Sequence, residues 1–341
     1  MTSSSPKSPS NPPPKHLTDT AADAGRLAAV KLRAIVPVLG LDPSQVEERD
    51  FPYGAGLVQS NRGALYVVRD HIRTIGPTLL WMQKHQLEEV DLVIEGDGGI
   101  PARRAQALTC ELRVWQVQNG KIERAQPAPH LPRIDVPQSH EQFAATIQDC
   151  GALPVREHGV LTGEVLGLEV CRVVDTPDGP RLEVGVGAID RETFQLVNSH
   201  RTIEDSLTEV VGIVRAHRQL GAPHHPLGKM AGERLLRHRV MNEPSLIGAS
   251  SLKPAEPPIA RGGLRDSMPC VATGTDLEDS SIVAVFTDTV DVDIIGFCAD
   301  ASILYVSSSS LVLVAQKGKI TSLLRRSSDL LNQVCKVVEV L

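Results

Sequence analysis

The stretch 161–192, LTGEVLGLEVCRVVDTPDGPRLEVGVGAIDRE, constrains the fold more than any other part of the chain. Valine-rich runs flank an Asp/Pro/Gly cluster at 175–180, a pattern typical of two strands joined by a turn. In the second run Leu182 and Val184 alternate with Glu183, so apolar and acidic side chains occupy opposite faces. The glycines that follow Glu183 indicate that another group approaches the acidic face closely. The sequence therefore predicts a long acidic β-hairpin in the middle of the chain.

Strand and helix patterns alternate on both sides of this hairpin. Two strand–helix–strand units are predicted, the first at 90–95, 101–108 and 111–117, the second at 311–315, 321–332 and 335–340. A further apolar strand is predicted at 281–287, and a helix at 202–219. The two units are consistent with a diverged duplication or with two independent βαβ units, of which we prefer the second; such units favour parallel strands. We therefore predict an α/β protein with mixed sheets, flanking helices, βαβ units at both ends and the acidic hairpin at its centre.

Changes in composition divide the chain into four segments. Residues 1–18 are rich in serine and proline and cannot bury apolar surface, so we expect a disordered tail. An α/β domain is predicted at 19–125, and a proline-rich linker at 126–138. The remainder, 139–341, is predicted as a second α/β domain with a helical cluster after the hairpin.

Overall composition narrows the function classes. The net charge of −6 opposes a general electrostatic nucleic-acid binder, and the aromatic content of 3% opposes base-stacking platforms. The six cysteines are scattered without a C-x-x-C pair, which indicates reduced thiols rather than a zinc site. Neither a secretory signal nor an apolar run of roughly 20 residues is present, so we expect a soluble cytoplasmic protein without membrane partners.

The hairpin carboxylates are the first candidate site. Carboxylates on neighbouring strands can hold Mg²⁺, which could activate water and stabilise a phosphoryl transition state. Under this hypothesis Glu164 and Glu183 are the metal ligands and act in catalysis together with Arg181. The alternative is that Glu164 and Glu169 form ion pairs with Arg172 and Arg181 across the hairpin, as sheet surfaces commonly do.

The order of elements around these carboxylates resembles the core of the PD-(D/E)XK nuclease-like fold. A helix with Glu141 precedes a strand with Glu164, a strand with Glu183, and a helix that begins near Arg191. The resemblance implies a metal-dependent phosphodiesterase with a lysine two residues after the second acidic residue. Gly185 stands at that position, so catalysis would need an arginine as substitute, and the core is degenerate in this respect.

A wider resemblance extends from the hairpin into the sequence that follows it. The run VLTGEVLGLEV…RLEVGVGAIDRE, the helix Thr202–Arg218 and the segment Gly221–Leu227 together resemble an uncharacterised conserved bacterial protein family. The resemblance implies a soluble intracellular protein and no particular activity.

Basic and histidine residues concentrate between 215 and 239. Arg215, Arg218 and Arg234 could bind the phosphates of a substrate or of a nucleic acid without reading its sequence. The alternative is a solvated helix surface, because Lys229, Glu233 and Arg237 follow one another at i,i+4 spacing. We favour the solvated surface.

Two loops that follow strands are weaker candidates. The glycine loop 96–99 precedes a helix with Arg103 and Arg104, an arrangement that can bind phosphate, although a tight turn with Pro101 explains it adequately. The aspartates after strand 281–287, at 288, 291 and 293, are interpreted as loop-capping residues.

These observations lead to two hypotheses. The first is a non-catalytic intracellular binding or scaffold protein, with a degenerate nuclease-like core. The alternative is a metal-dependent phosphodiesterase or nuclease-like enzyme that uses the hairpin carboxylates and Mg²⁺. The missing lysine after Glu183 favours the first.

Overall fold

The structure is a computed structural model, and it describes residues 16–68, 73–188, 190–192, 201–261, 263, 268–305 and 310–341. Most of the predicted disordered tail, and most of the helix predicted to begin near Arg191, lie outside the described residues. The chain divides into two compact units: the first comprises 1–71, 81–98 and 111–125, the second 72–80, 99–110 and 126–341. The domain boundaries proposed from the sequence stay a prediction.

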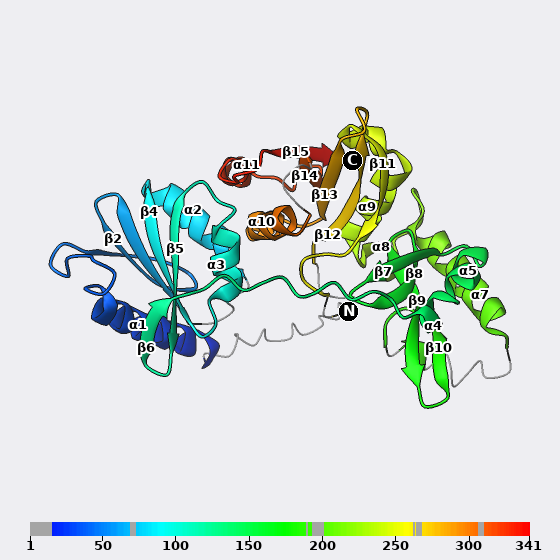
Figure 1. Cartoon of the computed structure of the whole chain (residues 1–341), viewed down its shortest axis with the longest axis horizontal. Coiled ribbons are helices and arrows are strands. Elements are labelled where there is room, and N and C mark those ends of the chain that lie inside the picture. Colours follow the sequence, from blue (N-terminus) through cyan, green and yellow to red (C-terminus); the bar gives the residue numbers. More distant parts are fainter. Residues whose placement is uncertain are drawn as a thin grey trace, which may run out of the picture. The chain divides into compact units, whose positions relative to one another are not determined.

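The first unit is built on a six-stranded sheet with strands in sequential order. Its strands are β1 (Glu47–Arg49), β2 (Gly54–Gln59), β3 (Arg62–Val67), β4 (Glu89–Glu95), β5 (Glu111–Gln118) and β6 (Lys121–Arg124). β3, β4 and β5 are parallel, and the other neighbours are antiparallel. Helix α1 (His16–Ile35) packs on one face through Ala28 and Leu32, and Val36, the residue after the helix, joins the same core (Figure 1).

The other face of this sheet accepts an aromatic ring. Trp81, from helix α2 (Ile75–His85), lies against Gly56 and Gly63. A Cβ atom would lie 2.7 Å from the Trp81 ring at Gly56 and 2.6 Å from it at Gly63, so only glycine fits there without displacing the ring.

A four-stranded antiparallel sheet forms one part of the second unit. It follows the short helices α4 (Gln138–Glu141) and α5 (Ala144–Asp149), and consists of β7 (Leu153–Glu157), β8 (Val160–Val165), β9 (Leu168–Thr176) and β10 (Gly179–Val184). Helix α7 (Ile203–Arg218) covers its apolar face with four aliphatic side chains, Leu207, Val210, Val211 and Val214. Thr202 caps this helix by accepting a hydrogen bond from the Asp205 amide at 3.1 Å.

The predicted hairpin is present as β9 and β10, but the acidic stretch contains a third strand. Leu166 and Gly167 have positive φ values of 48° and 76° and turn the chain between β8 and β9. A Cβ atom at Gly167 would lie 2.3 Å from the backbone of Arg234, so the turn fits closely against the neighbouring helix. The single long first arm predicted from the sequence is therefore two shorter strands.

The other part of the second unit is a five-stranded sheet with strands in sequential order, β11 to β15. Its elements are α8 (Pro226–Lys229), α9 (Gly232–Asn242), the 3₁₀ helix η2 (Pro244–Ile247), β11 (Ala249–Ala255), β12 (Cys270–Asp276), β13 (Ser281–Thr287), α10 (Ile294–Leu304), β14 (Ser310–Gln316), α11 (Ser322–Ser328) and β15 (Cys335–Val340). β13, β14 and β15 are parallel. The closing strand–helix–strand unit thus belongs to the same sheet as β11 and β12.

Helices cover both faces of this sheet. Leu236 and Val240 of α9 pack with Ala284, Phe286 and Val312 on one face. Helix α10 packs against β13 and β14, and Figure 1 shows it on the side away from α9. β13 and β14 are therefore buried on both faces, which explains their nearly continuous apolar sequences.

The predicted α/β class with mixed sheets is confirmed. In the six-stranded and five-stranded sheets alike, an antiparallel pair precedes three parallel strands, and helices join the parallel strands. Among the described residues, none of the helices is both long and apolar enough to span a bilayer.

Candidate functional site

The face of the four-stranded sheet opposite α7 carries its acidic side chains. Each of these carboxylates lies beside at least one arginine, and the four are Glu157, Glu164, Glu169 and Glu183. They divide into a group under α9 and a group on β9 and β10.

Helix α9 supplies the arginines of the first group, which we call the α9 cluster: Arg234, Arg237, Glu157 and Glu164. The two arginines are three residues apart and share one face of the helix. Arg237 donates to Glu164 Oε2 at 2.9 Å and to Glu157 Oε1 at 3.0 Å. Arg234 donates to Glu157 Oε2 at 2.5 Å and also to Glu164 Oε1.

The α9 cluster is almost completely buried. The side chains of Arg237 and Glu164 are 1% and 3% exposed. Burial works to raise the pKa of Glu157, but the charges of Arg234 and Arg237 outweigh it and hold that pKa below its usual range. The cluster therefore keeps the Glu157 carboxylate ionised inside the protein.

The second group lies on β9 and β10. Arg172 donates to both carboxylate oxygens of Glu169, at 2.9 and 3.0 Å, and Arg191 donates to Glu169 Oε1 at 3.0 Å. Glu183 accepts a hydrogen bond from Arg181 at 2.9 Å, and Arg191 Nε lies 3.7 Å from its other oxygen. Glu183 is 21% exposed, so solvent reaches this group.

The sheet register separates the two glutamates predicted as metal ligands. β9 lies between β8 and β10, and two strand spacings amount to about 9.5 Å. Glu164 is in register with Glu169, whereas Glu183 is in register with Arg172. A metal site on these two residues stays a prediction, and it requires both to leave their arginine partners. Within the described part of the chain, no group of three or more His, Cys, Asp or Glu side chains could hold a metal ion.

The three arginines predicted to bind substrate lie in different environments. Arg215 is exposed and donates to the Gly151 carbonyl at 3.1 Å, while Arg234 is part of the α9 cluster. Arg218 is buried and donates to four backbone carbonyls, those of Leu166, Leu227, Met230 and Ala231. Burial lowers the pKa of Arg218 to about 10, which leaves it charged at neutral pH.

The interpretation of α9 as a solvated surface is wrong. Glu233 and Arg237, which have the i,i+4 spacing of a surface pair, are each 1% exposed. The reason is tertiary: α9 packs on β12 and β13 while its arginines reach β7 and β8.

The glycine loop before α3 (Gly99–Ala105) does not present its arginines to a ligand. Arg103 and Arg104 donate to the two oxygens of Asp300 at 2.9 and 2.8 Å, and Arg104 also donates to Asp293 at 2.8 Å. Asp293, interpreted from the sequence as a loop cap, is thus a buried ion-pair partner that also accepts a hydrogen bond from the Gly76 amide.

Glu233 is a functional candidate that the sequence did not reveal. Its Oε1 is buried and has no hydrogen-bond partner among the described residues, and Arg261 lies 3.6 Å away. Burial raises the pKa of Glu233 to about 7, and the charge of Asp288 adds to the shift. A Cβ atom at Gly232 would lie 1.8 Å from the Asp288 carboxylate, so glycine is required beside it.

A surface groove of about 1000 Å³ lies between β7 and β11 in the second unit. These are edge strands of their sheets in the order that the structure describes. The groove is lined by hydroxyl and basic side chains, among them Ser251, Thr273, Thr275, Ser281, Lys253 and Arg133. Its size is near the upper limit of small-molecule sites, which are about 300–1,000 Å³.

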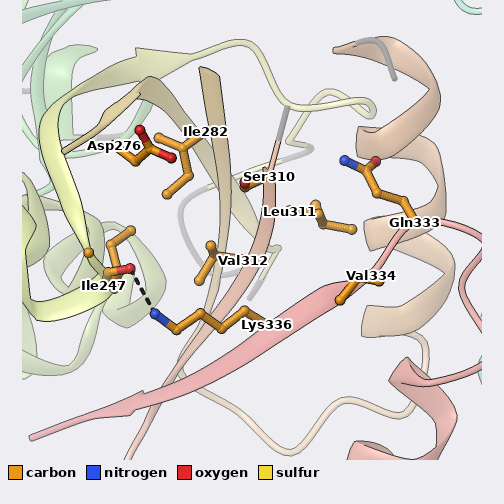
Figure 2. A pocket seen from close by; sticks show the side chains of 10 residues that line it. Ile247, Asp276, Ile282, Ser310, Leu311, Val312, Gln333, Val334 and Lys336 are labelled. Atoms are coloured by element: carbon orange, nitrogen blue, oxygen red, sulfur yellow. Dashed lines mark hydrogen bonds between the residues drawn. The ribbon is translucent and has the colours of Figure 1, made fainter. Parts of the chain in front are cut away.

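The smaller pocket, of about 450 Å³, lies at the amino ends of β13, β14 and β15. Figure 2 shows Lys336 extended below Val312 toward Ile247, whose carbonyl accepts its hydrogen bond at 3.4 Å. The Asp276 carboxylate accepts bonds from the Glu278 and Ser280 amides. Both charged side chains of this pocket therefore serve the local fold.

Comparison with protein-family models, with curated proteins and with solved structures gives no match to this chain.

Proposed function

We propose that this chain is a non-catalytic binding protein whose ligand site is the groove between β7 and β11. The observation that carries the proposal is that arginines hold every carboxylate on the polar face of the four-stranded sheet. A carboxylate in such a pair has little remaining capacity to bind a metal or accept a proton. The former catalytic face of a nuclease-like core would in this view serve to hold α9 against the sheet.

The groove is the part of the second unit best suited to a ligand. It offers side chains that donate and accept hydrogen bonds, on strands held rigidly by their sheets. An intracellular location is part of the proposal, and it is supported by the state of the six cysteines, which are all free thiols.

The test compares two exposed serines of the second unit. Ser251 on the edge strand β11 lines the groove, whereas Ser322, at the start of α11, does not. Thermal-shift measurements with a panel of anionic, neutral and cationic metabolites should find compounds that stabilise the wild type. Their effect should vanish in Ser251→Trp, in which the indole occupies part of the groove, and persist in Ser322→Trp.

Two results would contradict the proposal. One is that none of the compounds in the panel stabilises the wild type or the control variant. The other is Mg²⁺-dependent hydrolysis of a phosphodiester that is lost in Glu183→Ala, which would support the enzyme alternative.

A further inference from the structure

We infer that the groove between β7 and β11 binds a phosphate ester of a hydroxylated small molecule. This inference rests on the proposed function and adds the chemical class of the ligand. The phosphate would contact Lys253 and Arg133, and the hydroxyl groups would contact a row of serine and threonine side chains.

The register of the five-stranded sheet places Lys253 and the serine and threonine side chains on one face. Ser251, Thr275 and Ser281 are directly opposite one another on β11, β12 and β13. In the next row Lys253 is opposite Thr273. Alternate residues of a strand share a face, so the lysine and the hydroxyl row point to the same side. Hydroxyl groups both donate and accept hydrogen bonds, which matches the hydroxyl groups of a sugar.

The charge of the groove favours an anion. Among the described residues Lys253 has no ion-pair partner, and Arg133 is 77% exposed with Asp135 only at 4.0 Å. Arg156 also lines the groove, although Glu141 binds its guanidinium through two hydrogen bonds of 2.6 Å. Lysine and arginine are the usual partners of phosphate groups.

The one acidic residue in the groove does not cancel this charge. Glu256 accepts a hydrogen bond from the His158 amide at 2.7 Å, and its other oxygen lies 3.8 Å from the His158 ring. The carboxylate therefore faces the protein, and the groove keeps a positive balance.

The edge strands argue against a peptide as the ligand. An extended peptide adds to a sheet through backbone N–H and C=O groups of the edge strand. Pro154 lies within β7 and Pro254 within β11, and each removes a backbone donor from its edge. Such edges are better suited to bind a ligand through side chains, and hence to bind a small molecule.

The experiment is calorimetric titration of the whole chain with ribose 5-phosphate, ribose and inorganic phosphate. Ribose 5-phosphate should bind the wild type more tightly than either fragment. Lys253→Gln should weaken that binding about tenfold or more, because it removes a charged contact to the phosphate. The control is Lys317→Gln, at an exposed lysine in the turn after β14, and it should bind as the wild type does.

Three outcomes would overturn the inference. If ribose binds as tightly as its phosphate, or if Lys253→Gln leaves binding unchanged, the phosphate plays no part. If none of the three probes binds while the metabolite panel still yields a compound blocked by Ser251→Trp, the ligand class is wrong and the proposed function stands. If the panel also yields nothing, both fail.

Discussion

The two halves of the four-stranded sheet pair glutamates with arginines in very different surroundings. In the β7–β8 half, α9 covers the pairs, and Glu164 and Arg237 are 3% and 1% exposed. In the β9–β10 half, Glu183 and Arg181 are 21% and 47% exposed. The pairing chemistry is the same, but the Glu164–Arg237 pair is buried and the Glu183–Arg181 pair is open to water.

This contrast indicates that burial, rather than pairing, decides how much the loss of a glutamate lowers the free energy of unfolding. Removing one partner of a buried pair leaves an uncompensated charge and costs about 3–5 kcal/mol. An exposed pair contributes about 0–1 kcal/mol, because water solvates both ions when they separate. Glu164 and Glu183 look alike in the sequence, but their substitution should therefore change the free energy of unfolding by very different amounts.

The largest effect is expected for Glu164→Ala. It leaves Arg234 and Arg237 buried with only Glu157 as a carboxylate partner, so the free energy of unfolding should fall by about 3–5 kcal/mol. Urea denaturation measures the change. Replacing the pair together, as Glu164→Leu with Arg237→Met, should recover part of the loss. A loss below about 1 kcal/mol for the single variant would contradict the buried-network interpretation.

Asp300→Ala extends the comparison to the other buried cluster. Asp300 is fully buried and binds both Arg103 and Arg104, and its removal leaves Asp293 as the remaining acidic partner. We expect a loss of about 3 kcal/mol in unfolding free energy. Asp135→Ala, at a side chain that is 95% exposed, is the control and should change stability by less than about 0.5 kcal/mol. Equal effects of the two variants would be inconsistent with the structure.

Glu233→Gln tests the buried carboxylate on α9 whose Oε1 accepts no hydrogen bond among the described residues. Because the folded pKa of about 7 lies above the ordinary value of 4.5, the folded state binds more protons between these values. The contribution of protonated Glu233 to the free energy of unfolding is therefore fully present below pH 4.5 and is lost as the pH rises through 7. The variant should therefore be more stable than the wild type near pH 8, by about 2–3 kcal/mol, and similar near pH 4.5. A variant with unchanged pH dependence of unfolding would show that Glu233 is ionised throughout.

Glu183→Ala is the matched control for the buried glutamate and should have a small effect. Arg181 is 47% exposed, and Arg191 keeps Glu169 as a carboxylate partner, so the free energy of unfolding should fall by less than about 1 kcal/mol. Urea denaturation of Glu183→Ala and Glu164→Ala under the same conditions measures both losses. A loss as large as that of Glu164→Ala would remove the distinction between the two halves of the sheet.

The smallest expected effect is that of divalent metal. Because Glu164 and Glu183 are held by arginines, calorimetric titration with millimolar Mg²⁺ or Mn²⁺ should show no saturable binding to the hairpin. Saturable binding that disappears in Glu183→Ala would instead support the metal-dependent alternative and justify nuclease assays.

Much of the fold could be predicted from patterns within single elements. The strands predicted at 281–287 and 335–340 have these bounds in the structure, and the apolar run of the first lies between the polar residues Ser281 and Thr287. The helix predicted at 202–219 begins and ends within a residue of its prediction, with Thr202 as its cap. The break between β8 and β9 was missed, since it depends on the fit of Gly167 against the backbone of α9.

The candidate sites were harder to predict, because their chemistry depends on distant partners. Glu164 was correctly recognised as a polar residue on an apolar strand, but its partners Arg234 and Arg237 lie 70 and 73 residues away. Glu233 gave no signal, since its i,i+4 spacing to Arg237 is also typical of a solvated helix. The groove was missed because it lies between two strands of different sheets.

The sequence by itself determined the α/β class, several of the strands and the main helix patterns, because hydrophobic periodicity and turn residues act within a few positions of one another. Only the tertiary structure decided which charges are buried and which are solvated. That outcome depends on how α9 packs between two sheets, and the free energy of an ion pair depends on the water that such packing excludes.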